Sequence, residues 1–206
     1  MLRRIPVTSR EILTETRSRP CIVVDVQPAY RRAKNFDYIS KDIMLFLNYQ
    51  SGPILMFVNA EESGITEDTL DDVVMFWEDQ GFDPDNWSRV RPVDKGYGYF
   101  RSWMDEDVDE STIIRVIRAL YQKKVTDSRD LDPEYLKQLA GTEWQDWMMD
   151  DPILVEWTSV AQLKRFQGAY IMGGGRNECL REVELLMNAF NISYKRIDHL
   201  VYGDKL

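Results

Sequence analysis

Cysteine and carboxylate side chains are the strongest candidates for covalent chemistry in this sequence. The segment "MGGGRNECLREV" places Gly173, Gly174 and Gly175 just before an amphipathic run that begins near Cys179. A cysteine at the start of a helix meets exposed N–H groups and the positive end of the helix dipole, which lower a thiol's pKa and bind an oxyanion. This pattern predicts Cys179 as a nucleophile. The alternative is a buried, small apolar side chain on the inner face of its helix.

Two carboxylates stand where predicted strands end. Asp25 follows the apolar run "CIVV", and Glu156 follows "ILV". Ligands of an open parallel sheet bind beyond the carboxyl ends of its strands, so Asp25, Glu156 and the glycine turn are expected at one edge. A carboxylate embedded in an apolar strand has to be solvated or paired, and such groups are often functional.

Alternating strands and helices must position these side chains. Short apolar β-branched runs predict strands, and longer segments with apolar residues three or four positions apart predict helices. Strands are predicted at 20–28, 53–60, 152–157, 168–174 and 194–202, and helices at 38–52, 66–82, 109–124, 158–166 and 177–191. Thr66 is the predicted cap of the helix at 66–82, whose first turn is acidic.

This alternation predicts an α/β fold, a three-layer αβα sandwich around a mostly parallel sheet. The 206 residues are expected to form a single domain, 1–206, that carries a long insertion at about 64–152. Within the insertion, residues 83–107 are rich in Pro, Gly, Asp and aromatics and predict a long loop. Residues 126–152 predict a short helical excursion.

The composition excludes several classes of function. A formal net charge of −9 with scattered Lys and Arg argues against nucleic acid as a partner. No apolar run approaches the roughly 20 residues that span a bilayer, and the first residues have no apolar signal-peptide core. Two cysteines far apart in sequence fit free thiols in a reducing compartment. We therefore expect a cytoplasmic protein without a membrane partner.

Two short motifs resemble those of isochorismatase-like cysteine hydrolases. In "VVDVQPAY", Asp25, Gln27 and Tyr30 match the Asp, Gln and aromatic residue found where this family's first strand ends. In "GGGRNECLREVELLMNAFNISY", Gly173 and Cys179 match the glycine that stands six residues before the family's nucleophile. The order of elements extends the resemblance over most of the chain.

The resemblance implies a hydrolase that cleaves an amide or related C–N bond of a small molecule through a thioester on Cys179. In the family scheme the Asp, here Asp25, takes the thiol proton, and a Lys favours the ionised forms of the Asp and Cys side chains. The N–H of Cys179 and that of a neighbour would form an oxyanion hole, with a cis peptide near Gly174–Gly175. The residues expected at the substrate are Gln27, Tyr30, Gly174 and Gly175.

The lysine is where the sequence departs from the family pattern. The predicted strand that should carry it ends in Glu156, and an acid there would raise the thiol's pKa. Lys95 in "VDKGYGYFRSW" is the other candidate, because the family's lysine is followed by a small residue and Phe. The hypotheses are a hydrolase that uses Asp25, Lys95, Cys179 and Glu156, or an inactive relative that binds a protein or ligand through the segment 64–152.

Other partners follow from weaker signals. No cofactor and no metal are expected, because His199 is the only histidine. A nucleotide- or phosphate-binding module built on the glycine turn is a third hypothesis.

The segment 159–203 also resembles uncharacterised proteins of tailed phages, which would place the chain in a host cytoplasm. Trp144 and Trp147 predict a homo-oligomer contact, and a lid over the same domain is the alternative.

Overall fold

Five parallel strands form the sheet in the part of the chain that the computed structural model describes, residues 17–59, 68–94 and 98–203. The strands are β1 (Cys21–Val24), β2 (Ile54–Val58), β3 (Val90–Asp94), β4 (Ala169–Gly173) and β5 (Tyr194–Val201), in the spatial order β3-β2-β1-β4-β5. Every neighbouring pair is parallel, which confirms the predicted parallel sheet. The central strands are buried apolar runs, as a sheet covered on both faces requires.

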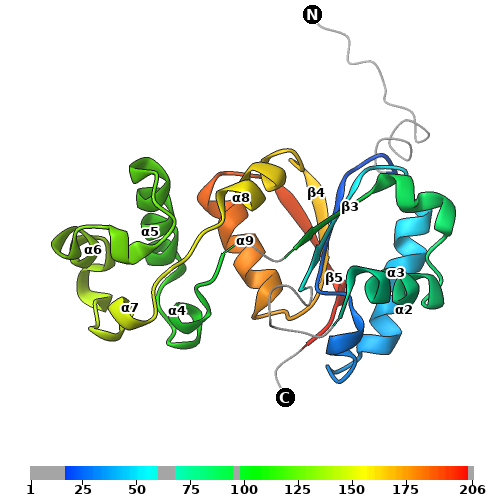
Figure 1. Cartoon of the computed structure of the whole chain (residues 1–206), viewed down its shortest axis with the longest axis horizontal. Helices are drawn as coiled ribbons and strands as arrows, with labels where there is room; N and C mark the ends of the chain where they lie inside the picture. Colours follow the sequence, from blue (N-terminus) through cyan, green and yellow to red (C-terminus); the bar gives the residue numbers. More distant parts are fainter. Residues whose placement is uncertain (1–16, 60–67, 95–97, 204–206) are drawn as a thin grey trace, which may run out of the picture.

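Helices cover both faces of the sheet, an arrangement compatible with a three-layer sandwich (Figure 1). On one face lie α2 (Phe36–Tyr49) and α3 (Leu70–Asp79), and on the other lie α8 (Trp157–Lys164) and α9 (Cys179–Ala189). Alternate residues of β1 divide between the two cores: Ile22 and Val24 pack with the α9 side, and Cys21 and Val23 pack with the α2 side. This two-residue period is the property of a strand that allows one segment to hold two layers together.

The first residue of α3 differs from the prediction. The predicted cap, Thr66, lies outside the described residues, and the helix begins after Thr69. The Thr69 hydroxyl accepts a hydrogen bond from the Asp72 N–H at 3.1 Å, and the Asp72 carboxylate accepts one from the Thr69 N–H at 2.9 Å. This reciprocal capping box satisfies two N–H groups at the helix end, which fixes its start.

The prediction of a long loop at 83–107 is wrong. This segment contains a 3₁₀ turn, η3 (Pro84–Arg89), the edge strand β3 and the short helix α4 (Arg101–Asp105). Strand β3 is half-exposed and contains Pro92 and charged residues, which an edge strand tolerates because one side of it needs no hydrogen-bonding partner. Its sequence "VRPVD" therefore lacks the apolar run used to find strands.

The predicted strand at 152–157 is also wrong. Leu154 makes only isolated antiparallel bridges, to Tyr99 and to Asp127, and α8 begins at Trp157. Ile153 and Val155 are buried in the same core as α9, which accounts for the apolar pattern without a strand. The connection between the helical excursion and the sheet is therefore an extended segment in which Ile153 and Val155 are buried and Leu154 and Glu156 are exposed.

The excursion from the sheet is shorter than the predicted insertion at 64–152, because α3 and β3 belong to the layers. It consists of α4, α5 (Glu110–Lys123), η4 (Ser128–Asp130), α6 (Pro133–Ala140), η5 (Gly141–Glu143) and α7 (Trp147–Asp150). In Figure 1 these helices lie beyond α9, on the side away from the sheet. None of the helices in the described residues is both long enough and apolar enough to span a membrane.

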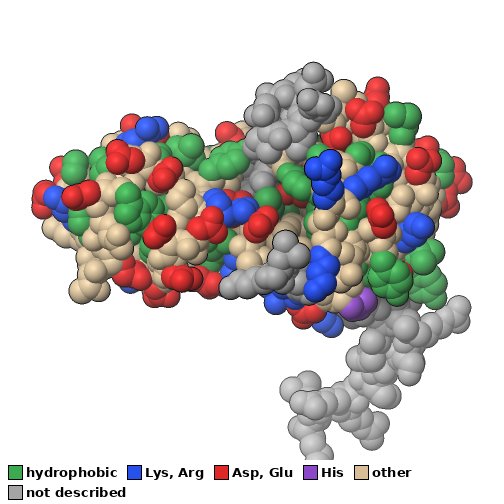
Figure 2. Space-filling view, turned by 90° about the horizontal axis from the view of Figure 1, so that it is seen from below, with side chains coloured by type: hydrophobic (Ala, Val, Ile, Leu, Met, Phe, Trp, Pro, Cys, Tyr) green, Lys and Arg blue, Asp and Glu red, His purple; other side chains and the backbone are tan. Residues whose placement is uncertain are grey.

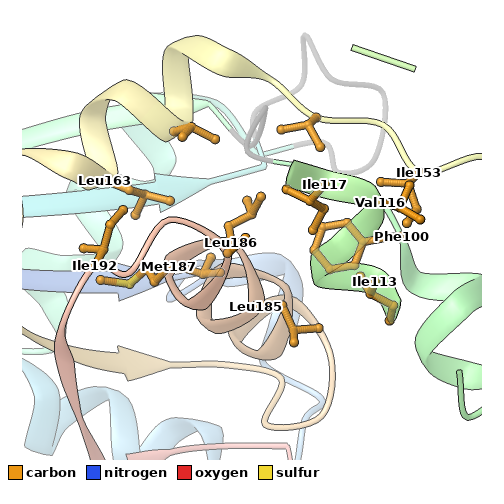
Figure 3. Close-up of a cluster of buried hydrophobic side chains, with 14 of the residues drawn as sticks. Phe100, Ile113, Val116, Ile117, Ile153, Leu163, Leu185, Leu186, Met187 and Ile192 are labelled. Carbon is orange, nitrogen blue, oxygen red and sulfur yellow. The ribbon is translucent and has the colours of Figure 1, made fainter. Parts of the chain in front are cut away.

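A continuous apolar cluster joins the excursion to α9 (Figure 3). Ile113 and Ile117 of α5 and Phe100 face Leu185 and Leu186 of α9, and all five are buried.

Tryptophan side chains of the excursion also pack against each other within the chain. Trp147 packs edge-on against Trp103, with ring centroids 5.9 Å apart. The predicted homo-oligomer contact through Trp144 and Trp147 stays a prediction.

Candidate active site

A cavity of about 380 Å³ opens where the carboxyl ends of the strands meet the start of α9. Its lining consists of Asp25, Tyr30, Arg32, Ala33, Lys34, Gly175, Asn177, Glu178, Cys179, Tyr202 and Gly203. The structure thus brings Asp25, Tyr30, Gly175 and Cys179 of the predicted site into one cavity. Figure 2 shows the molecule from the side toward which the strands of Figure 1 run, where basic and acidic side chains are interspersed.

Asp25 occupies the cavity floor, directly after β1. Its side chain is buried, and its backbone φ of 55° lies in the left-handed region that few residues other than glycine adopt. Asp and Asn tolerate this conformation best, and such strain is concentrated at functional sites. The Asp25 carboxylate accepts a hydrogen bond from the Asn59 side-chain amide at 3.3 Å.

Asn59, the residue after β2, connects three parts of the floor. Its side-chain amide also donates to the Tyr30 hydroxyl. Its backbone N–H donates to the Gln27 side-chain oxygen at 2.7 Å, and its carbonyl accepts from the Gln27 amide at 2.8 Å. Gln27 is fully buried and absent from the cavity lining, so it ties β1 to β2 and does not reach the place predicted for a substrate.

The glycine turn after β4 permits a close approach of the chain. Gly173 has a φ of 110°, and a side chain there would meet the Val24 backbone. A side chain on Gly174 would collide with the Tyr202 ring. The described residues contain no cis peptide bond, so the cis peptide expected near Gly174–Gly175 is not found. The glycines instead make room for neighbouring strands and for Tyr202.

Tyr202, the first residue after β5, reaches back across the sheet to β1. Its hydroxyl donates a hydrogen bond to the Asp25 carbonyl, and its ring packs edge-on against Phe36 with centroids 4.9 Å apart. Burial raises the pKa of Tyr202 well above its usual value, and negative charge at Asp25 and Cys179 raises it further. Tyr202 therefore stays protonated and serves as a fixed donor beside both groups.

Cys179 is the first residue of α9 and is 7% exposed, through the cavity. The Gly175 carbonyl accepts hydrogen bonds from the N–H groups of Glu178 at 2.9 Å and Leu180 at 3.2 Å. These two amides are consequently engaged by the turn. The N–H of Cys179 itself stays the predicted oxyanion donor, and the eleven-residue helix behind it supplies the positive dipole end.

A guanidinium group contacts the thiol. Arg101, the first residue of α4, donates from Nη2 to the Cys179 sulfur at 3.4 Å. Its other contacts are ion pairs with Glu178 at 3.4 Å and with the buried Glu182 at 3.6 Å. Burial alone would lower the pKa of Arg101, but Glu182, Cys179 and Glu178 outweigh it and raise that pKa. A permanent positive charge on the guanidinium therefore lies 3.4 Å from the sulfur.

Cys21, the second thiol, has a different environment. It is fully buried as the first residue of β1, and desolvation raises its pKa to about 12, although Arg89 opposes this. A thiol with that pKa carries almost no thiolate near neutral pH and is a poor nucleophile. Both thiols are therefore buried within core clusters, as the alternative interpretation of Cys179 expected, but of the two only Cys179 also lines the cavity.

Of the other two predicted catalytic residues, Glu156 lies away from the cavity lining. Glu156 is exposed and caps α8, where its carboxylate accepts from the Thr158 N–H at 2.9 Å. Lys95 lies outside the described residues. Glu156 therefore has a structural role at a helix start, for the physical reason that the predicted strand before it does not form.

Sequence reasoning missed several residues of the site. Asn59 and Tyr202 directly follow β2 and β5, so the strand-end rule that selected Asp25 could have found them. Arg101 carried no such signal, because it comes from a segment predicted to be a loop. Arg32 and Lys34 belonged to a locally basic stretch, "YRRAK", but nothing in the sequence placed that stretch opposite Cys179.

Comparisons with known proteins add no family to this description. No family model matches the chain, and no curated protein and no solved structure matches it.

Proposed function

We propose that this protein is a cysteine-dependent hydrolase on an isochorismatase-like fold that cleaves an amide or related C–N bond of a small molecule. The observation that carries the proposal is the cavity shared by Asp25 and Cys179, with the Arg101 guanidinium 3.4 Å from the sulfur. A nucleophilic thiol needs a base, a group that favours the thiolate, and space for a substrate. The proposal assigns these roles to Asp25, to Arg101 and to the cavity, respectively.

The reaction begins with transfer of the Cys179 thiol proton to the Asp25 carboxylate. The thiolate attacks the substrate carbonyl carbon, a C–S bond forms, and the carbonyl electrons move onto oxygen, where the Cys179 N–H stabilises them. Collapse of this intermediate breaks the C–N bond, and the amine leaves with the proton held by Asp25. The product of this half-reaction is a thioester on Cys179.

Water completes the cycle. Asp25 takes a proton from the water as the oxygen attacks the thioester carbon, and the C–S bond breaks to release the carboxylic acid. The sulfur leaves as a thiolate that Arg101 stabilises, and it regains a proton from Asp25. Tyr202 holds the Asp25 backbone in place throughout, because its hydroxyl donates to the Asp25 carbonyl.

Arg101 takes the electrostatic role that the family resemblance gives to a lysine. A cation within hydrogen-bond distance favours the ionised thiol, and a guanidinium keeps its charge at every physiological pH. Its pairing with the buried Glu182 orients it toward the cavity. Lys95, the residue predicted as the lysine of the triad, lies outside the described residues.

The test is turnover of p-nitrophenyl acetate, an activated acyl donor small enough for the cavity. The wild type and Cys21→Ala should release nitrophenol in excess over enzyme, whereas Cys179→Ala should release it only at the background rate. Mass spectrometry should find the acetyl thioester on Cys179. Release that stops at one equivalent, or turnover that survives Cys179→Ala, would contradict the hydrolase and leave the inactive, ligand-binding alternative.

A further inference from the structure

One wall of the cavity is basic and faces the start of α9. It is formed by the turn at 31–35 between η1 (Pro28–Tyr30) and α2, which contributes Arg32, Ala33 and Lys34 to the lining. The segment at the start of α9 contributes Asn177, Glu178 and Cys179 to the same lining. A ligand in the cavity therefore has both the two long basic side chains and the thiol within its surroundings.

The acidic groups of the cavity already have partners. Glu178 pairs with Arg101 at 3.4 Å, and the Asp25 carboxylate accepts the Asn59 amide at 3.3 Å on the floor. Arg32 and Lys34 are exposed at the opening, and neither forms an ion pair or hydrogen bond with any residue that the structure describes. The mouth of the cavity consequently presents positive charge that nothing in the described chain neutralises.

This local charge contrasts with the rest of the protein. A chain with a formal net charge of −9 repels anions in general, so attraction of an anion requires a local cluster of cations. Arg32 and Lys34 form such a pair in the lining of the cavity that also contains the thiol. Arg presents a planar fork of donors that fits a carboxylate or phosphate, and Lys adds a second charge without fixed geometry.

We propose, on the basis of the proposed hydrolase function, that the substrate is a small acyl compound with an anionic group at the end distant from the scissile bond. Arg32 and Lys34 hold this carboxylate or phosphate at the mouth, and the reacting carbonyl lies at Cys179. A cavity of about 380 Å³ limits the substrate to a small molecule. The basic pair selects against neutral and cationic analogues.

The proposal is tested with two alkylating probes of nearly equal size, iodoacetate and iodoacetamide. In each reaction the Cys179 thiolate forms an S–C bond and iodide leaves, but only iodoacetate carries an anion. The ratio of their rate constants therefore reports attraction of an anion, and the iodoacetamide rate normalises for the reactivity of the thiol. We expect the ratio for the wild type to exceed that for free N-acetylcysteine and to fall as salt is added.

The double variant Arg32→Gln/Lys34→Gln should lower the iodoacetate-to-iodoacetamide ratio about fivefold to tenfold. The matched control is Arg31→Gln/Lys41→Gln, which changes the net charge equally. Arg31 lies over the Phe76 ring and Lys41 is exposed on α2, and neither lines the cavity. The control should leave the ratio near that of the wild type.

The outcomes separate the two proposals. Equal effects of the two double variants, or a wild-type ratio no higher than that of N-acetylcysteine, would overturn the anionic substrate while the hydrolase stands. Failure of both probes to alkylate Cys179 in the folded wild type would overturn the activated thiol itself. Circular dichroism of each variant establishes that the fold is retained.

Discussion

The Arg101 guanidinium donates a hydrogen bond to the Cys179 sulfur at 3.4 Å, although the two residues are 78 positions apart in the chain. Arg101 begins a helix of the excursion, and Cys179 begins the helix that covers the sheet. The excursion therefore supplies a charged group that contacts the thiol. Its packing on α9 through the buried cluster of Figure 3 fixes the position of that charge.

Replacement of Arg101 should make the thiol harder to ionise. For Arg101→Gln, the midpoint of Cys179 alkylation against pH should move upward by about 1–2 pH units, because an adjacent cation is lost. Arg101→Lys should retain most of the effect. The measurement is the iodoacetamide rate constant between pH 5 and 10, and Arg115→Gln, which changes an arginine bonded to the Leu139 carbonyl, is the matched control.

Loss of Arg101 also leaves the buried Glu182 without this partner. The free energy of unfolding should fall by about 1–3 kcal/mol in Arg101→Gln. The double variant Arg101→Gln/Glu182→Gln also removes the uncompensated carboxylate charge, so it should recover part of the lost free energy of unfolding. An unchanged pH midpoint in Arg101→Gln would show that the guanidinium does not stabilise the thiolate.

The two cysteines should differ in reactivity. With limiting iodoacetamide near neutral pH, Cys179 should be labelled first, because Cys21 is fully buried and its pKa is raised to about 12. Mass spectrometry of the labelled peptides measures the order. Preferential labelling of Cys21, or labelling only after denaturation, would refute an activated Cys179.

Asp25→Asn should reduce the reactivity of Cys179 without loss of the fold. Asn tolerates the φ of 55° at this position and keeps the shape of the side chain, but it cannot accept the thiol proton. We expect at least a tenfold lower iodoacetamide rate at neutral pH. Asp68→Asn is the control, since Asp68 accepts from Gln27 and from the Ala29 N–H and does not line the cavity.

Native circular dichroism in Asp25→Asn is the condition for this comparison. A collapse of the spectrum would identify Asp25 as a structural residue of the floor, and an unchanged alkylation rate in a folded variant would remove it as the base.

The alkaline stability of the protein should depend on Cys21. Its folded pKa of about 12 exceeds the ordinary value of 9.0, so the stability that the buried neutral thiol contributes is complete below pH 9 and declines as pH rises toward 12. The decline is about 1.4 kcal/mol per pH unit within this window. Urea unfolding at pH 7, 9 and 10.5 should show a shallower decline for Cys21→Ala than for the wild type. Cys179→Ala serves as the comparison, and parallel declines in wild type and Cys21→Ala would contradict the prediction.

Gly174→Ala should disturb the packing of Tyr202. An added methyl group would collide with the Tyr202 ring, and relief of that collision should cost roughly 1–3 kcal/mol of unfolding free energy. Tyr202→Phe keeps the ring and removes only the hydrogen bond to Asp25, which is worth about 1 kcal/mol. Chemical denaturation measures both. A Gly174→Ala loss no larger than that of Tyr202→Phe would argue against close packing at this glycine.

The central strands, the helices that cover them and the parallel sheet can be predicted from the sequence alone. Periodicity is a local property: the buried run at 21–24 and the three-to-four spacing at 179–189 appear within a few residues of chain. The same local information selected Asp25, at the end of a strand, and Cys179, at the start of a helix. The half-exposed edge strand β3 was not predicted, because an edge strand needs neither a continuous apolar run nor hydrogen-bonding partners on both sides.

The positions of three basic side chains depend on how distant segments pack. Arg101, Arg32 and Lys34 have no periodic signature in the sequence. Arg101 contacts the Cys179 sulfur because the excursion packs on α9, whereas Arg32 and Lys34 line the cavity from the turn at 31–35. For Glu156 the location predicted from the sequence is wrong. The prediction places it at the end of a strand, but Ile153 and Val155 are buried in an extended connection, and Glu156 caps the helix that follows. The residue type determines the chemistry that a side chain can perform. Its contact partners are determined only when distant segments of the chain pack into one core, because burial and electrostatic interaction depend on distance in space and not on separation along the chain.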